Sequence, residues 1–146
     1  SIDRLCADVP EAARRLARAH WPGPLTLVLR ARDGLGWDLG DTGGTIALRV
    51  PDHPGALALL RMTGPMAVTS ANTTGRPPAT TVAYFGGAVG LYVDAGPTAS
   101  STPSTVVAFA GGAARVLRHG ALGADDIAAL APLEAEGRAG EGDNAR

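Results

Sequence analysis

Small polar side chains are concentrated in "GPMAVTSANTTGRPPATT", residues 64–81, directly after a short apolar run. Hydroxyl groups, an amide and a guanidinium follow residues 66–68, and two prolines close the stretch. Hydroxyls and amides make directional hydrogen bonds, whereas guanidinium groups suit carboxylates and phosphates. This composition predicts a recognition surface rather than a plain loop.

Other segments offer the same kinds of groups at strand ends. Side chains of a strand alternate between its two faces. In "TIALRV", residues 45–50, one face is therefore wholly apolar, and the other presents Thr45 and Arg49. Ser70 and Asn72 share one side if the chain stays extended there. The full set of candidate site residues is Thr45, Arg49, Ser70, Asn72, Thr80, Ser104 and Arg118.

This set contains no nucleophile paired with a base. The three histidines stand beside neither Ser70 nor Ser104 in an evident motif. The lone cysteine, Cys6, forms neither an internal disulfide nor a metal cluster, and we expect it to be a small buried side chain. We therefore predict no catalytic acid, base or nucleophile and no metal ligands. Such a site would act by positioning two substrates and stabilising charge.

Each candidate also has a purely structural interpretation, which the sequence leaves open. Thr45 and Ser104 could be ordinary strand residues, and Arg49 could be a solvated charge. Residues 70–72 could form a helix cap or turn, and residues 75–78 a rigid turn. For His53 and His119 a surface or helix-capping role is the stronger interpretation, and for Trp21 and Trp37 it is packing.

Apolar periodicity and turn residues predict nine elements. Helices are expected at 10–20, 53–62 and 123–130. Strands are expected at 24–31, 45–51, 65–71, 90–96, 103–110 and 114–120, the last two joined by a turn at 111–112. A disordered tail is expected over 132–146. The pattern predicts an α/β (α+β) fold, a mixed sheet of five or six strands with three helices on it.

The composition bounds the function. The chain has 146 residues, 45% of them hydrophobic, with 13 basic and 14 acidic residues, so bulk charge indicates neither a nucleic-acid binder nor an acidic tail protein. Every basic residue is arginine, which excludes a Walker A loop and Schiff-base chemistry. No apolar run approaches a membrane span and no signal peptide is visible, so we expect a cytoplasmic protein that contacts no membrane.

Five segments occur in a specific order and spacing: "WPGPLTLVL" (21–29), "TIALRVPDHP" (45–54), "GPMAVTSANTTGRPPATT" (64–81), "PSTVV" (103–107) and "VLRHGAL" (116–122). They resemble the YrdC-like family, the threonylcarbamoyl-adenylate synthases. The resemblance runs over residues 1–131 and implies a twisted YrdC/RibB-like sheet with an open concave cavity. It implies the short form of the family, without a further C-terminal domain.

The resemblance implies a nucleotidyltransferase that makes threonylcarbamoyl-AMP from L-threonine, bicarbonate or CO2, and ATP, releasing pyrophosphate. Mg²⁺ would accompany ATP. The product would serve a downstream transferase complex that forms N6-threonylcarbamoyladenosine at position 37 of tRNA. By motif, Arg49, Ser70 and Ser104 match threonine-binding positions. The ATP-binding positions are matched by Thr45, Asn72, Thr80 and Arg118.

Two departures qualify this expectation. The family's N-terminal part, with a Thr-Tyr-Gly-Leu strand end and a basic Lys-x-Arg segment, has no counterpart here, so we expect a truncated domain with weak turnover or none. Many relatives carry Asp after "STVV", where this chain has Ala108.

Two rival functions remain open. The first is a non-catalytic module of the same fold that binds double-stranded RNA or tRNA through phosphate contacts. Six arginines in the middle of the chain support it, namely Arg30, Arg32, Arg49, Arg61, Arg76 and Arg118. The second is a carbamoylating domain like that of hydrogenase maturation factors, although the Cys-x-x-Cys motifs of those proteins are absent from this sequence.

Overall fold

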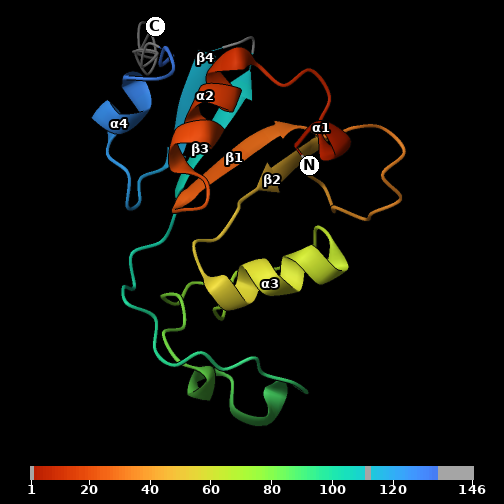
Figure 1. The fold of residues 1–146 in the computed structure, drawn as a ribbon, viewed down its shortest axis with the longest axis vertical. Helices are drawn as coiled ribbons and strands as arrows, with labels where there is room; N and C mark the ends of the chain where they lie inside the picture. Colours follow the sequence, from red (N-terminus) through yellow and green to blue (C-terminus); the bar gives the residue numbers. More distant parts are fainter. Residues whose placement is uncertain (1, 111–112, 135–146) are drawn as a thin grey trace, which may run out of the picture.

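Four strands form one mixed sheet in the computed structural model, which describes residues 2–110 and 113–134 (Figure 1). They are β1 (Leu25–Arg30), β2 (Thr45–Leu48), β3 (Thr105–Ala110) and β4 (Ala113–Arg118), in the spatial order β2-β1-β3-β4. β1 pairs with β2 antiparallel and with β3 parallel, and β3 pairs with β4 antiparallel. β2 returns the chain along β1, and the crossover, residues 49–104, then connects the end of β2 to the start of β3.

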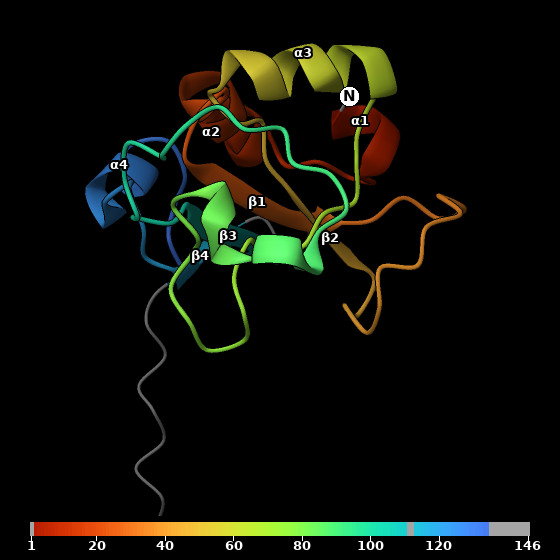
Figure 2. The ribbon, with the colours of Figure 1, turned by 90° about the horizontal axis from the view of Figure 1, so that it is seen from below.

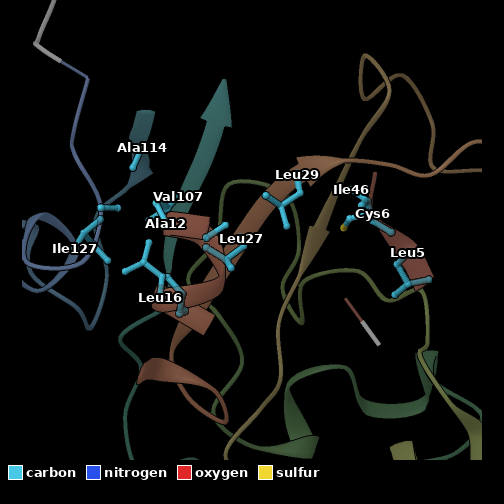
Figure 3. Packing of buried hydrophobic residues seen from close by; sticks show 13 residues of the cluster. Leu5, Cys6, Ala12, Leu16, Leu27, Leu29, Ile46, Val107, Ala114 and Ile127 are labelled. Atoms are coloured by element: carbon cyan, nitrogen blue, oxygen red, sulfur yellow. The ribbon is translucent and has the colours of Figure 1, made fainter. Parts of the chain in front are cut away.

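The core lies on one face of this sheet. Leu25, Leu27 and Leu29 of β1 are buried because alternate residues of a strand share a face. Helix α2 (Glu11–His20) covers them with its apolar side, including the fully buried Leu16. Figure 3 shows Leu16 and Ala12 of α2 beside Leu27 of β1 and Val107 of β3. Because the leucines of β1 are buried against α2, the residues between them lie on the opposite face of the strand.

Three helices confirm their predicted positions. These are α2, α3 (Pro54–Thr63) and α4 (Ala124–Ala128). α3 begins with a proline in its first turn, and Nδ1 of His53 accepts a hydrogen bond from the Ala56 N–H at 3.3 Å. His53 is thus a helix-capping residue. A further helix, α1 (Ile2–Leu5), was not predicted, because four residues carry no readable periodicity.

The predicted strands at 65–71 and 90–96 are wrong. Neither segment pairs in a sheet among the described residues, which hold four strands instead of the expected five or six. Val68, Leu91 and Val93 are 77–81% exposed, so these alternating apolar side chains are not packed against other described residues. Apolar alternation makes a strand only where neighbouring backbone is available to pair with it. The 3-10 helices η1 (Val82–Tyr84) and η2 (Gly86–Ala88) lie between these two segments.

The crossover lies to one side of the sheet. Figure 1 shows α3 and the segment with η1 and η2 set apart from the strands and joined to them by extended chain, and Figure 2 shows η1 and η2 in front of the sheet. No helix of the described residues is both long and apolar enough to span a membrane.

The C-terminal end of the described chain lies against β4. The Ala114 N–H donates to the Pro132 carbonyl and the Glu134 N–H donates to the Ala114 carbonyl, each at 2.8 Å. Ordered backbone therefore continues past the predicted start of the tail. The rest of that predicted tail and the predicted turn at 111–112 lie outside the described residues.

Cys6 confirms the expectation of a small buried side chain, being 1% exposed. Burial raises the pKa of its thiol to about 11, and nearby Asp3 adds to this rise. We therefore expect slow reaction with an aromatic disulfide reagent at neutral pH and fast reaction in denaturant, followed by absorbance. Because the folded-state pKa is raised, the thiol favours folding below pH 9.0, and this contribution is lost as the pH rises towards about 11. Equal labelling rates in both states would contradict the burial.

Candidate functional site

A hollow of about 2060 Å³ lies between the uncovered side of the sheet and the crossover. All seven candidate residues line it: Thr45, Arg49, Ser70, Asn72, Thr80, Ser104 and Arg118. They come from β2 and the residue after it, from the loop at 70–80, from the residue before β3 and from the end of β4. The structure therefore brings the whole predicted set to one concave surface.

The charge of this hollow is strongly positive. Five arginines line it, against one aspartate, Asp52, among the described residues that form its wall. Arg49, Arg61, Arg76 and Arg118 belong to this group, and Arg4 joins them. The other two arginines noted in the sequence are used elsewhere, because Arg30 faces Asp8 and Arg32 donates to backbone carbonyls. Such a surface favours an anionic ligand.

Arg49 is held by backbone at the end of β2. Its Nε donates to the carbonyl of Gly23 at 3.0 Å, and the Gly23 N–H donates to the Val50 carbonyl at 2.8 Å. Within the described part of the chain, Arg49 makes no salt bridge. One side of the guanidinium is thus fixed, and its terminal amino groups are left for a ligand.

Ser104 and Arg118 form a second anchored pair. Arg118 donates from Nε and a terminal nitrogen to the Ser104 carbonyl, at 3.2 and 2.9 Å. The same terminal nitrogen donates to Ser104 Oγ at 3.0 Å. Ser104 is only 6% exposed, and its Oγ also lies 2.8 Å from Thr26 Oγ1. The buried serine therefore contacts both Thr26 and Arg118 at the wall of the hollow.

Two candidates also have local structural roles. Thr45 Oγ1 donates to the Thr42 carbonyl at 2.8 Å, closing the turn before β2. The side-chain amide of Asn72 donates to the carbonyls of Thr73 and Arg76, at 3.1 and 3.0 Å. Their oxygen atoms remain available as acceptors.

Residues 70–72 form a turn, which confirms the turn interpretation of this stretch instead of the extended one. The Asn72 N–H donates to the Ser70 carbonyl at 2.9 Å, so this stretch turns. The polar side chains compete for backbone groups and favour a turn over a strand. The Ala79 N–H donates to the Ala71 carbonyl at 2.7 Å and closes the loop 71–79, which Ser70 and Thr80 flank.

The sequence interpretation missed Thr26. It lies in an apolar run that reads as a buried strand, and no polar neighbour marks it. The available signal was the alternation of β1, which places Thr26 on the face opposite the buried leucines. Trp21 confirms its packing role, because it lies against the core and its indole N–H donates to the Leu25 carbonyl at 2.8 Å.

The described residues do not supply a metal cage. They contain no group of three or more histidine, cysteine or acidic side chains placed to hold an ion. Mg²⁺ often binds through substrate phosphates and water with few protein carboxylates. The described residues around the hollow therefore fit a Mg²⁺ ion bound through phosphates and water, and not one held by protein ligands.

The fold and the hollow define a mixed α/β protein with a concave surface lined by arginines. A family model for Sua5, YciO and YrdC, described as telomere recombination, matches residues 1–120. The chain belongs to the Sua5/YciO/YrdC family, which confirms the resemblance seen in the sequence.

Relatives of known name are similar over much of the chain. A Mycobacterium tuberculosis protein named "Putative threonylcarbamoyl-AMP synthase" is 43% identical over 139 residues, covering 92% of this chain and 64% of its own length. The threonylcarbamoyl-AMP synthase of Bacillus subtilis is 40% identical over 103 residues, covering 66% of this chain and 30% of its own length. The chain thus spans less than two thirds of these relatives.

Solved structures confirm the fold class. Sua5 of P. abyssi in complex with L-threonine superposes with a TM-score of 0.79 at 30% identity, over 92% of this chain and 43% of that protein. YciO of E. coli superposes with a TM-score of 0.73 at 26% identity, over 86% and 64% of the two chains.

Proposed function

We propose that this chain carries the substrate-binding part of an L-threonylcarbamoyladenylate synthase. One observation carries the proposal: seven candidate side chains from separate segments line one arginine-rich hollow. Relatives at 43% and 40% identity bear the name of this synthase, and the P. abyssi relative was solved with L-threonine. The reaction joins L-threonine, bicarbonate or CO2, and ATP, and releases pyrophosphate.

The residues divide between the two larger substrates. Arg49, Ser70 and Ser104 would bind threonine, with the guanidinium facing its carboxylate. Arg118 would bind phosphate. The side-chain oxygens of Thr45 and Asn72 would accept from the remainder of ATP, and the Thr80 hydroxyl would donate or accept.

The chemistry needs positioning more than proton transfer by a side chain. The threonine amine forms a bond to the carbon of CO2 and loses a proton, or it displaces water from bicarbonate as a C–O bond breaks. Either route gives an N-carboxylate. An oxygen of that group then forms a bond to the α-phosphorus of ATP while the bond to pyrophosphate breaks. The arginines would stabilise the charge that builds on the phosphate oxygens. Mg²⁺, when present with ATP, would neutralise phosphate charge, and the described residues would hold it only through the nucleotide.

Ligand binding and pyrophosphate release test this proposal. We expect threonine and ATP each to bind in isothermal titration calorimetry. Pyrophosphate release, measured by a coupled phosphate assay, should require threonine, bicarbonate and ATP together. Failure to bind either threonine or ATP would contradict the proposal, whatever the turnover.

The comparisons do not favour the RNA-binding alternative, because the named relatives are synthases. Its distinguishing result is salt-dependent tRNA binding without nucleotide binding. Delivery of the product to a transferase complex, and residence in the cytoplasm, remain predictions of the family assignment.

A further inference from the structure

The segment at residues 21–26, "WPGPLT", contacts both sides of the proposed threonine site. Its Gly23 carbonyl accepts from Arg49 Nε at 3.0 Å, and its Pro24 carbonyl accepts from the Thr105 N–H at 2.9 Å. Thr26 Oγ1 lies 2.8 Å from Ser104 Oγ. The segment therefore contacts Arg49 on one side and Ser104 and Thr105 on the other, a role that its residue types did not predict.

The hydrogen-bond inventory at Ser104 leaves one choice open. A guanidinium only donates, so Arg118 occupies a lone pair of Ser104 Oγ. The bond between the two hydroxyls can run either way. If Ser104 donates to Thr26, its single proton is spent and it offers the hollow no donor. If Thr26 donates, Ser104 accepts twice and keeps its proton for a ligand.

The surroundings of Ser104 fix its backbone independently of this choice. Thr105 Oγ1 donates to the Leu122 carbonyl and accepts from the Leu122 N–H, at 2.8 and 2.9 Å. Arg118 holds the Ser104 carbonyl at 2.9 Å. The remaining freedom of this residue is the rotation of its hydroxyl, and Thr26 is the neighbour placed to control it.

We propose that Thr26 is a positioning residue that donates to Ser104 Oγ, so that Ser104 presents its proton to an oxygen acceptor of the bound amino acid. The identity of that ligand rests on the proposed function. Thr26 shares the hollow with Ser104, because parallel pairing sets Leu25 opposite Thr105 and Thr26 opposite Val106. In this proposal, the Gly23 carbonyl orients Arg49 and the Thr26 hydroxyl orients Ser104.

Three variants of the full chain test this role by calorimetry with L-threonine and with ATP. Thr26→Val keeps the shape and removes the hydroxyl, and should weaken threonine binding about fivefold to tenfold. Thr26→Ser restores the hydroxyl and should stay within about twofold of the unaltered chain. Thr63→Val is the matched control, since Thr63 donates within α3 and does not line the hollow.

The comparison of ligands separates positioning from general damage. ATP binding by Thr26→Val should change less than threonine binding, because Arg118 keeps its bonds to the Ser104 carbonyl. Equal weakening of both ligands, or failure of Thr26→Ser to restore threonine binding, would overturn the proposal. So would unchanged threonine binding by Thr26→Val.

A second measurement needs no ligand. Thermal unfolding midpoints of Thr26→Val, Ser104→Ala and the double variant form a cycle. We expect the double variant to shift the midpoint by less than the sum of the two single shifts, and additive shifts would overturn the contact. If the unaltered chain binds no threonine, the proposed function and the ligand-facing role of Ser104 both fail, whereas the cycle still supports or overturns the Thr26–Ser104 bond.

Discussion

Arg49→Ala is expected to weaken threonine binding about 30- to 150-fold, because a charge-assisted hydrogen bond contributes about 2–3 kcal/mol. ATP binding should change much less, since the proposed phosphate contact comes from Arg118. Arg49 stands free of salt bridges within the described chain, and its Nε is already bound to the Gly23 carbonyl at 3.0 Å. Isothermal titration calorimetry with each ligand separates the two affinities.

Arg30→Ala is the matched control for this prediction. Arg30 is exposed, faces Asp8 at 3.6 Å and does not line the hollow. Its loss should leave both affinities within about twofold, because exposed pairs contribute little. Arg49→Lys should fall between, since lysine keeps the charge and loses the planar contact. An equal loss of threonine and ATP binding by Arg49→Ala would contradict the division of the site.

Gly120→Ala is expected to destabilise the fold by about 2–3 kcal/mol. A Cβ atom at Gly120 would lie 2.4 Å from the Pro103 carbonyl oxygen, 2.5 Å from the Ser104 carbonyl carbon and 2.6 Å from the Thr105 nitrogen. All three are backbone atoms, which cannot turn aside as a flexible side chain can. The start of β3 must therefore shift, and Ser104 shifts with it. Urea unfolding followed by circular dichroism measures the loss.

Gly90→Ala provides the comparison, because its Cβ would meet no atom within 4 Å. Its unfolding free energy should stay within about 0.5 kcal/mol of that of the unaltered chain. In a Gly120→Ala chain that remains folded, we also expect weaker threonine binding. Equal stability of the two variants would contradict the close approach of the β4 end to residues 103–105.

Local sequence patterns predicted the elements that carry their own signal. The alternating leucines of β1 and the spacing of Ala12, Ala13 and Leu16 in α2 mark buried faces without reference to the rest of the chain. The strands expected at 65–71 and 90–96 show the same alternation and are not strands in this structure. Alternation indicates which side chains seek burial, but pairing depends on which backbone lies alongside, and that is not local information.

The sequence by itself determined the chemistry of the candidate site, because residue type fixes which groups donate, accept or carry charge. The sequence contains arginines but no lysines, and it places hydroxyl side chains at the ends of strands. Only the tertiary structure decided which of these groups meet. The parallel pairing of β1 with β3 brings Thr26 to Ser104 across 78 positions of sequence, and the antiparallel pairing of β3 with β4 adds Arg118 to the same pair. Spacing along one chain does not encode such contacts, since they arise only when separate strands share a sheet.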